Sequence, residues 1–405
     1  MNILLSAYSV NPYHGSEDGI GWNWTLQLSK NFPDSKIYLL TKRFNEKDTE
    51  KGIKEFNLKN VELVIVDVPD CLNWFREKHS AFHHMYYYLW QCVAYRWAKG
   101  SGIKFDIIHH ITMGDFRFTG KMYRFKDAYT IYGPVGGGQS TPPSLKCYEK
   151  NQKVEKFREI INKTRAVSPF YKRRIKRFDD IYAINKETAE IISKASDGRC
   201  RLLMELAVSD EFKSLKIEKV PNDTLSIVFV GRLIEKKGLM LLLDVIDRVD
   251  KNIPYTLTIY GGGPLSEAIE QTVKEKELDG RVFLAGSVDH TKISKAYQGA
   301  DIFVMPSLRE TSGNVLIEAM AHRVPVAALD MSICSQLKVQ NCGCFINTNQ
   351  SREAVINDFA SAIEELAKSP EKRAELGENG YRFVNDELTW ENKFNTVYGK
   401  FINTK

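Results

Sequence analysis

One stretch of this 405-residue sequence, from Ala300 to Asp330, constrains the fold more strongly than any other. It reads ADIFVMPSLRETSGNVLIEAMAHRVPVAALD. Its apolar pattern predicts a strand over residues 301–305, a polar loop, a helix over 314–321 and a second strand over 325–329. Strand, loop, helix and strand in this order form a βαβ unit, which requires a parallel sheet. In such a sheet the loop and the helix N-terminus lie at the carboxyl edge, where ligands bind.

The loop and the first helical turn combine an anion site with two carboxylates. Backbone N–H groups at Gly313, Asn314 and Val315 are unpaired donors of the first turn and suit an anion. Glu310 and Glu318 bracket this segment, and they are better suited to accept hydrogen bonds from sugar hydroxyls than to bind phosphate. Phosphate at the amides and hydroxyls at the carboxylates together describe a nucleotide-sugar.

Glu310 and Glu318, with seven residues between them in PSLRETSGNVLIEAMA, resemble the signature of retaining glycosyltransferases of the large GT-B family 4. The resemblance implies an α/β fold of GT-B architecture, with two Rossmann-like, doubly wound domains facing across a cleft. It also implies that Glu310 holds the hydroxyls of the transferred sugar and that Glu318 holds the nucleotide ribose. An ordinary βαβ crossover with two solvated glutamates is the alternative, but other family features recur in the right order.

Length and composition fit two globular domains. A chain of 405 residues is too long for one core and suits two domains of about 200 residues each. Hydrophobic residues make up 43% and charged residues 27%, which is typical of globular proteins. We expect an N-terminal acceptor-binding domain over residues 1–210 and a nucleotide-sugar-binding domain over 211–387. A C-terminal helix over about 388–405 should pack back on the first domain.

Cysteine use and hydropathy bear on the compartment. The seven cysteines are scattered and form no Cys-x-x-Cys, which argues for a reducing cytoplasm and against a disulfide or zinc framework. The start, MNILLSAYSV, has no basic n-region and indicates a buried first strand, not a signal peptide. No run of 18 apolar residues exists, so no membrane span is expected. We expect a cytoplasmic protein that can work at the cytoplasmic face of the membrane.

The predicted second domain opens with a strand that ends at a cationic glycine turn. Residues 226–230 run into Gly231 and Arg232, and Lys237 follows shortly after. Two cations beside a glycine turn at the carboxyl end of a strand form a diphosphate site. In the family that the chain resembles, the matching arginine and lysine hold the β-phosphate of the donor. The other donor-binding positions that the resemblance implies are Gly262, Ser287, Val288, Ser312, Gly313, Asn314 and Val315.

Two glycine-containing loops of the first domain are candidates for the acceptor side. The glycines of NPYHGSEDGIG do not form G-x-G-x-x-G, and no acidic residue follows the second strand for a ribose, so NAD is discounted. The resemblance implies instead that Gly15, Ser16 and Glu17 face the interdomain cleft and help to hold the acceptor and the donor phosphate. Gly136 and Gly137, in a run of three glycines, resemble a cleft-facing loop of the same family. A plain turn is the alternative for both.

The strand FDIIHHIT, residues 105–112, ends in two histidines. Many family members read aspartate, two apolar residues, histidine, any residue, histidine here. Counted from Asp106, His109 matches the first histidine, Ile111 replaces the second, and His110 lies beside it. Both histidines are candidate catalytic residues near the transferred sugar, and satisfied strand-end histidines are the alternative.

The chain contains no Asp-x-Asp, the motif that would hold a divalent ion on a donor diphosphate. Arg232, Lys237 and the helix N-terminus would then stabilise the charge that leaves with the nucleotide. We predict a retaining transfer, without metal or cofactor, from a nucleotide-sugar (UDP favoured, GDP second) to a hydroxyl of a cell-surface polysaccharide or lipid-linked oligosaccharide. Another GT-B enzyme, such as a phosphorylase or sugar-nucleotide epimerase, and a non-catalytic partner subunit remain as alternatives.

Two further segments bear on the acceptor. Residues 72–100 are rich in aromatic side chains, which fill core helices or meet a membrane interface. Residues 150–177 carry eleven basic residues against two acidic ones. No groove-reading motif accompanies them, so no nucleic-acid partner is expected. A solvated helix face and a contact with anionic lipid headgroups are the two interpretations left.

Overall fold

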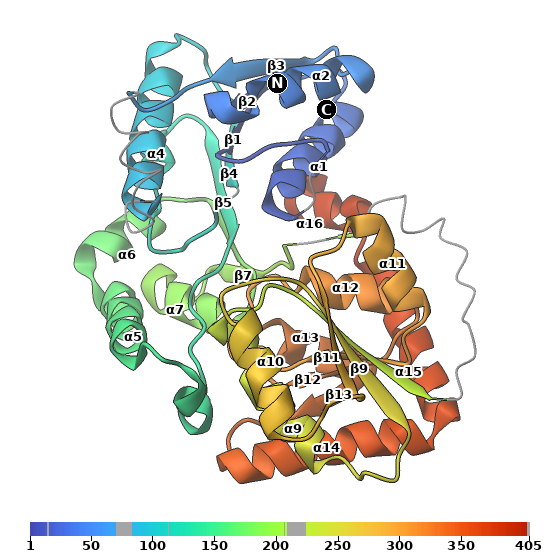
Figure 1. The fold of residues 1–405 in the computed structure, drawn as a ribbon. Helices are drawn as coiled ribbons and strands as arrows, with labels where there is room; N and C mark the ends of the chain where they lie inside the picture. Colours follow the sequence, from blue (N-terminus) through green and yellow to red (C-terminus); the bar gives the residue numbers. More distant parts are fainter. Residues whose placement is uncertain (14–15, 70–82, 112, 206, 209–223, 403–405) are drawn as a thin grey trace. The chain divides into compact units, whose positions relative to one another are not determined.

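The chain folds into two compact units. The computed structural model describes residues 1–13, 16–69, 83–111, 113–205, 207–208 and 224–402. The first unit comprises Met1–Gly138, Ile160–Glu205 and Trp390–Lys405, and the second comprises Gln139–Glu159 and Leu206–Thr389 (Figure 1). The sequence-based boundaries differ mainly at residues 139–159, which they assign to the first domain but whose contacts are with the second unit.

The first unit is built on a seven-stranded parallel sheet with the order β3-β2-β1-β4-β5-β6-β7. Its strands are β1 (Asn2–Ala7), β2 (Lys36–Thr41), β3 (Val61–Ile65), β4 (Ile107–Ile111), β5 (Tyr129–Val135), β6 (Asp180–Ala183) and β7 (Cys200–Leu202). Its helices are α1 (Ser16–Asn31), α2 (Glu46–Glu55), α4 (His83–Gly100), α6 (Pro169–Ile175), α7 (Lys186–Ser196) and α16 (Trp390–Ile402), and α5 (Gln152–Val167) leads into it. The strand order reverses between β1 and β4, which makes the gap between them the topological switch point.

Aromatic side chains of α4 fill the core of the first unit. Tyr86, Tyr87 and Trp90 are at most 3% exposed. Their rings meet the ring of Tyr8, just after β1, at centroid distances of 5.2–6.5 Å and in edge-on orientation. These three rings are therefore core residues and are closed to lipid. The part of the aromatic segment before residue 83 lies outside the described residues.

The last helix, α16, packs on α1 within the first unit. The rings of Trp390 and Tyr398 both lie 5.7 Å from that of Trp24, and Phe394 lies 5.6 Å from Phe32. Trp24 and Tyr398 are completely buried. The end of the chain thus contributes an apolar helix face to the first unit.

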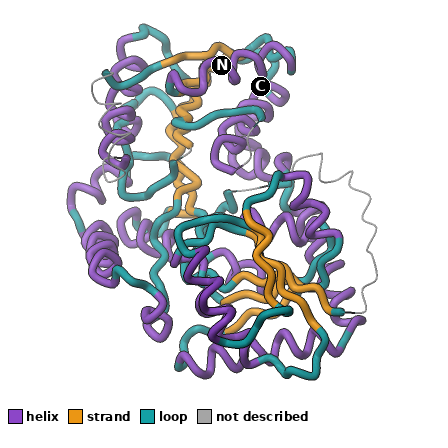
Figure 2. The backbone as a smooth tube through the Cα atoms, viewed as in Figure 1, coloured by secondary structure: helices purple, strands orange, loops and turns teal. Residues whose placement is uncertain are grey.

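The second unit is built on a six-stranded parallel sheet with the order β10-β9-β8-β11-β12-β13. Its strands are β8 (Leu225–Val230), β9 (Tyr255–Tyr260), β10 (Val282–Gly286), β11 (Ile302–Met305), β12 (Val326–Leu329) and β13 (Gly343–Ile346). The helices are α9 (Leu239–Arg248), α10 (Ser266–Glu275), α11 (His290–Gln298), α12 (Asn314–Ala321), α13 (Ile333–Leu337), α14 (Arg352–Lys368) and α15 (Pro370–Arg382). Figure 2 shows these strands in orange, flanked by purple helices. Here the strand order reverses between β8 and β11.

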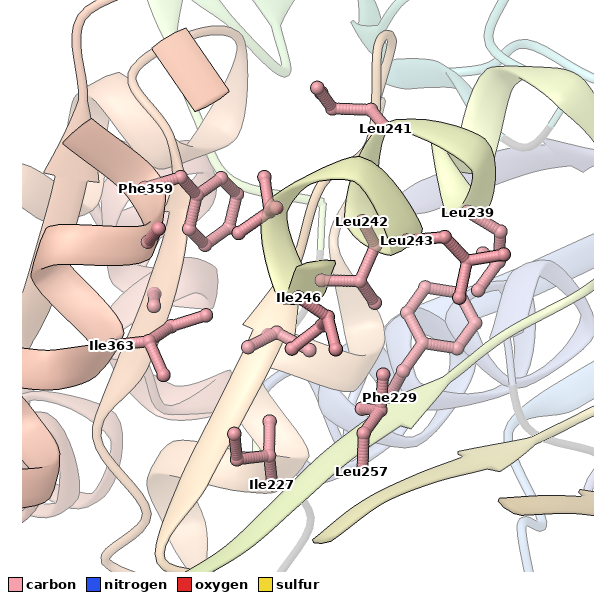
Figure 3. Packing of buried hydrophobic residues seen from close by; sticks show 14 of the residues in the cluster. Ile227, Phe229, Leu239, Leu241, Leu242, Leu243, Ile246, Leu257, Phe359 and Ile363 are labelled. Atoms are coloured by element: carbon pink, nitrogen blue, oxygen red, sulfur yellow. The ribbon is translucent and has the colours of Figure 1, made fainter. Parts of the chain in front are cut away.

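In the core of the second unit, α9 and α14 pack against each other, and α14 also packs against β12 and β13 of the sheet. Figure 3 shows Ile227 and Phe229 of β8, Leu242 and Ile246 of α9, and Phe359 of α14 in one apolar cluster. All five side chains are at most 1% exposed. Burial of this kind stabilises by about 25 cal/mol per Å² of apolar surface. It also holds the start of α9 at the carboxyl end of β8.

Both units confirm the predicted fold class of parallel, doubly wound Rossmann-like sheets. The stretch from Ala300 to Asp330 forms β11, α12 and β12, and Phe303 pairs with Val326 in parallel register. None of the helices formed by the described residues combines the length and apolarity that a bilayer span requires.

Candidate active site

The switch point of the second unit brings together the loops that follow β8 and β11. The N–H of Leu308, after β11, donates to the carbonyl of Lys236, after β8, across 2.9 Å. Ligands of open parallel sheets bind at the carboxyl edge of such a switch point. These two loops therefore form the candidate active site, and it lies entirely within the second unit.

Glu310 lies in the loop after β11, where its carboxylate has three partners. Oε2 forms an ion pair with Nζ of Lys237 and accepts a hydrogen bond from Oγ of Ser307 at 3.3 Å. Oε1 accepts the N–H of Thr311 at 3.2 Å. The side chains of Lys237 and Glu310 are only 17% and 12% exposed. Because each carboxylate oxygen has two lone pairs, this arrangement orients Glu310 and leaves acceptor capacity for a hydroxyl.

A glycine turn places Lys237 against that loop. Gly238 has φ 71°, and a Cβ atom built on it would lie 2.0 Å from the carbonyl oxygen of Pro306. No other residue can occupy this position without moving one of the two loops. Gly238 ends the short helix Glu235–Lys237 and starts α9, so the turn fixes both the lysine and the helix.

The N-terminus of α12 supplies the predicted anion site. Gly313 adopts φ 66° and precedes Asn314, the first residue of the helix. N–H groups in the first turn have no acceptor within the helix, and the helix dipole places partial positive charge there. Oδ1 of Asn314 is buried, with no hydrogen-bond partner among the described residues. The site can therefore donate hydrogen bonds to an anion and accept one from a nearby hydroxyl.

Glu318 lies one turn into α12, beside a buried tyrosine. Oη of Tyr297 is 3.2 Å from Oε2 of Glu318 and 3.3 Å from the carbonyl oxygen of Val315. Burial, together with the Glu318 carboxylate, raises the pKa of Tyr297, so its hydroxyl stays protonated. This contact orients the carboxylate of Glu318 on the first turns of α12.

The remaining predicted donor residues lie at the same edge of the sheet. Arg232 is exposed directly after β8. A Cβ atom on Gly262, after β9, would lie 2.7 Å from Oγ of Ser287, after β10, so these loops pack closely. Val288 continues the loop after β10, and Ser312 precedes the glycine at the N-terminus of α12. The four loops after β8, β9, β10 and β11 and the first turns of α12 thus contain the predicted donor residues.

In the first unit, Glu17 bridges the loops at the other switch point. It lies in the first turn of α1, and its carboxylate accepts the N–H of Met113, after β4. Burial raises the pKa of Glu17, although this hydrogen bond opposes the shift. Gly15 and the side chain of Ser16 lie outside the described residues. Of the three predicted positions, the structure therefore places Glu17 at the carboxyl edge.

The triple-glycine segment after β5 is held by side chains of the first unit. The carbonyl of Gly137 accepts hydrogen bonds from Nη2 of Arg117 at 2.6 Å and Nδ2 of Asn162 at 3.2 Å. The N–H of Gly136 donates to the carbonyl of Gly114. Gly137 has φ 99°, and a Cβ atom there would lie 2.8 Å from Nη1 of Arg117. Glycine is required here by conformation and by close packing.

His109 is completely buried in β4. Its Nε2 lies 2.7 Å from the carbonyl oxygen of Gly133, and its Nδ1 lies 2.7 Å from Oη of Tyr398 on α16. Nε2 must therefore donate, and Nδ1 accepts from the tyrosine. Burial lowers the pKa of His109 to about 3, which keeps the ring neutral.

His110 is 4% exposed and has a similar environment. Its Nε2 lies 2.7 Å from Oη of Tyr87, and its Nδ1 lies 3.0 Å from Oγ of Ser6. Burial lowers its pKa to about 4. The geometry gives both histidines a structural role, and a catalytic role for either stays an untested prediction.

The sequence reasoning missed a set of charged residues next to Glu310. Arg309 forms ion pairs with Glu149 and Glu155, which belong to the segment 139–159. The available signal was weak: Glu155 is one of only two acidic residues in the basic run 150–177.

Two other kinds of site are less well supported. A cavity of about 500 Å³ is lined by residues 123–129, Arg177 and Asp179. It lies near the amino-terminal ends of β5 and β6, the edge of the sheet opposite to the one that binds ligands. Among the residues that the structure describes, no three or more histidine, cysteine, aspartate or glutamate side chains are grouped to hold a metal ion.

Residues 210–383 match the protein family described as "Glycosyl transferases group 1". The poly(ribitol-phosphate) alpha-N-acetylglucosaminyltransferase of Staphylococcus aureus is 27% identical over 244 residues, which cover 54% of this chain and 48% of that protein. The chain spans only 22% to 50% of the length of the leading curated relatives that it matches.

Solved structures match over nearly the whole chain and show the fold. The apo form of the lipopolysaccharide outer core galactosyltransferase WaaB has a TM-score of 0.66 and 18% identity, covering 99% of this chain and 100% of that one. The Anabaena protein HepE in complex with UDP and glucose has a TM-score of 0.59 and 14% identity, covering 99% of both chains. At these identities both structures show that the chain shares their fold.

Proposed function

Because residues 210–383 belong to the glycosyl transferases group 1 family, we propose that this chain is a retaining glycosyltransferase that uses a nucleotide-sugar donor. The observation that carries the proposal is the ion pair of Lys237 and Glu310 at the switch point of the second unit. Glu310 of this pair lies in the loop that leads from β11 to the N-terminus of α12, and Glu318 follows within that helix. A nucleotide-sugar is a diphosphate linked to two sugars. A cation and amide N–H groups suit its diphosphate, and two carboxylates suit the hydroxyls of its sugars.

Each charged residue has a proposed role in binding the donor. Arg232 and Lys237 bind the diphosphate, and the N–H groups of the first turn of α12 add to this anion site. Glu318 accepts hydrogen bonds from the ribose hydroxyls. Glu310 accepts them from the hydroxyls of the transferred sugar. The ion pair with Lys237 would link the sugar end of the donor to its phosphate end.

In the proposed reaction, the bond between the anomeric carbon and the phosphate oxygen breaks and positive charge develops on the sugar. The acceptor hydroxyl attacks from the face that the phosphate leaves, so the anomeric configuration is retained. The proton of that hydroxyl passes to the departing phosphate. Arg232 and Lys237 stabilise the charge that leaves with the nucleotide, and no step of the proposal requires a divalent ion. Each such preorganised group typically contributes about 2.7–4 kcal/mol of transition-state stabilisation.

We propose a UDP-sugar as the donor, with a GDP-sugar as the second candidate. HepE, which shares the fold, was solved with UDP and glucose. In the proposal, the main chain of the loop after β10, with Ser287 and Val288, meets the base. Main-chain contacts of that kind discriminate weakly between bases, so the donor must be identified by assay.

The acceptor that we propose is a hydroxyl of a surface polysaccharide or a lipid-linked oligosaccharide. Support comes from the surface of α5 and α6. Val154, Phe157, Ile160, Val167 and Phe170 are 49–78% exposed. Those on α5 recur at helical spacing along one side of the helix, and exposed lysines and arginines lie between and beside them. An apolar stripe bordered by cations suits an anionic membrane surface.

Hydrolysis of a panel of nucleotide-sugars without acceptor tests the proposal. Wild-type protein should release a nucleoside diphosphate from one donor of the panel, a UDP-sugar in the favoured case. The Glu310→Gln variant should release far less. The same panel names the donor. If the wild type neither hydrolyses nor transfers any donor of the panel, in the presence of glycan acceptors as well, the chain is a non-catalytic partner subunit instead.

A further inference from the structure

The segment Gln139–Glu159 is anchored on the second unit at several points. Leu145 is completely buried in the core of that unit. Oη of Tyr148 donates to Oδ2 of Asp244 at 2.6 Å, and the N–H of Lys150 donates to Glu235 at 3.1 Å. The segment is therefore fixed to the helices and loops that follow β8. Polar side chains of the segment contact the loop after β11 and can hold that loop in place.

Arg309, the residue before Glu310, is held by two carboxylates of this segment. Its Nη2 lies 2.8 Å from Oε1 of Glu155, and its Nε lies 3.3 Å from Oε1 of Glu149. Glu149 is 4% exposed, and it also accepts a hydrogen bond from Thr141. The Arg309 side chain is 19% exposed. The ion pairs are thus shielded from water. Nε of Arg309 makes no hydrogen bond to the described residues, so its contact with Glu149 is an ion pair only.

A second path of hydrogen bonds leads back to Glu310 itself. Oε2 of Glu155 pairs with Nε of Arg158 at 2.8 Å, and Nη2 of Arg158 donates to the carbonyl of Gln139 at 2.6 Å. Nε2 of Gln139 donates to the carbonyl of Glu310 at 3.1 Å. These contacts run from the side chain of Arg309 to the main chain of Glu310, and the peptide bond between the two residues closes the ring. Main-chain movement at these two residues would break at least one bond of the ring.

Stability alone does not account for so many charges in a shielded place. Removing charges from water costs free energy that their attraction only partly returns, and apolar replacements are often as stable. The benefit of such a cluster is a defined geometry. Here that geometry is given to the residue that bears the proposed catalytic carboxylate.

We propose that Arg309, Glu149, Glu155 and Arg158 form a positioning cluster that directs the Glu310 carboxylate toward the transferred sugar. The inference rests on the proposed function for the role of Glu310. The four residues do not touch the donor: they act through the main chain at residues 309–310. They should therefore affect kcat more than the binding of the nucleotide, which other residues hold.

Arg309→Met keeps the length of the side chain and removes its charge. We expect kcat to fall about 10²-fold, since a misplacement of about 1 Å at a reacting group has this effect. The KM for the donor and the Kd for the free nucleoside diphosphate should stay within about threefold of their wild-type values. Glu155→Gln, a milder change, should lower kcat about tenfold with the same pattern. Arg309→Lys should recover part of the loss because it restores one ion pair.

The matched control is Lys146→Gln, which removes the ion pair of Lys146 with Glu159 in the same segment but does not touch Arg309. It should leave kcat unchanged. Hydrogen exchange of residues 306–313 supplies a readout that needs no substrate: exchange should be faster in Arg309→Met than in wild type. Unchanged exchange, an unchanged kcat, or a loss of kcat that merely follows the fraction of unfolded protein overturns the inference. Failure of the proposed function shows separately, as a wild type that is inactive with every donor.

Discussion

At the scale of single residues, Glu310 and Glu318 are held in different ways. Glu310 is paired with a cation in a loop, whereas Glu318 is oriented by a tyrosine hydroxyl on a helix. A glutamine in either place keeps the shape but removes the charge. The two carboxylates should therefore differ in which kinetic step they serve.

Glu310→Gln should lower kcat by a factor on the order of 10², because the charge facing the transferred sugar is lost in the transition state. Glu318→Gln should instead weaken nucleotide binding about tenfold, through the loss of charged hydrogen bonds to the ribose. Steady-state kinetics measures the effect on kcat, and titration with the nucleoside diphosphate measures the effect on nucleotide binding. Full transfer and full donor affinity in Glu318→Gln would refute its assignment to the ribose.

The structural role of His109 predicts an acid-dependent loss of stability. The pKa of His109 is about 3 in the folded protein, against an ordinary value of 6.5, because the ring is buried. As pH falls below about 6.5 the unfolded chain binds a proton that the folded chain does not, so the free energy of unfolding decreases toward pH 3.

His109→Gln should flatten this acid-dependent loss and lower Tm at neutral pH by about 2–4 °C, because the two buried hydrogen bonds are disturbed. The turnover rate of the folded variant should stay within about threefold of wild type. Thermal unfolding between pH 5 and 7.5 and a kinetic assay measure both. If turnover instead fell by about two orders of magnitude while Tm was unchanged, the catalytic role of His109 would be supported.

At the scale of elements, local patterns predict strands and helices well and their distant partners poorly. The apolar periods of residues 301–305 and 314–321 place β11 and α12 to within one residue. By contrast, Arg309 meets Glu149 from a segment 160 residues earlier in the chain, and His109 meets Tyr398 from one 289 residues later. Hydrophobic period reports which face of an element is buried, but not which element covers it. Glu310 could be found because its motif is local, whereas its positioning cluster could not.

Helix α16 contains an unusual buried cation that gives a second pH prediction. Lys393 is 5% exposed, donates to the carbonyl of Glu205 and lies 4.4 Å from the ring centre of Trp390. Burial lowers its pKa from 10.5 to about 7. Between these two values the unfolded chain binds more protons than the folded chain, so the free energy of unfolding rises with pH through this window.

Lys393→Met should raise Tm at about pH 7, where the buried charge costs most, and the gain should shrink as pH approaches 10. Thermal unfolding of variant and wild type at several pH values across this window gives the difference. Because other groups titrate equally in both proteins, they cancel. A difference in Tm that does not change with pH would show that Lys393 is not a shifted cation.

At the scale of the whole molecule, each unit uses a carboxylate to join the loops of its switch point. In the first unit, Glu17 accepts the N–H of Met113 after β4. In the second unit, Glu310 pairs with Lys237 after β8. In the second unit, the main-chain hydrogen bond from Leu308 to Lys236 joins the same two loops. Both carboxylates thus lie at the carboxyl edge of a switch point, where open parallel sheets bind ligands.

The surface of α5 and α6 carries the proposed contact with an anionic membrane. Phe157 and Phe170 are 65% and 78% exposed, and the surrounding run is strongly basic. Wild-type protein should sediment with vesicles that contain anionic lipid, bind zwitterionic vesicles at least tenfold more weakly, and lose binding as salt rises above about 0.15 M. The attraction amounts to about 1 kcal/mol for each basic side chain near the surface.

The double variant Phe157→Ser and Phe170→Ser should weaken vesicle binding about tenfold, because the apolar insertion is lost while the charge stays. Donor hydrolysis in solution should be unchanged, because both side chains are largely exposed and neither belongs to the positioning cluster. The matched control is Val339→Ser, at a residue 78% exposed on the second unit, which should bind vesicles like wild type. Wild-type protein that remains in the supernatant with anionic vesicles at low salt would mean that α5 and α6 present a solvated face, and the acceptor would then have to reach the enzyme in solution.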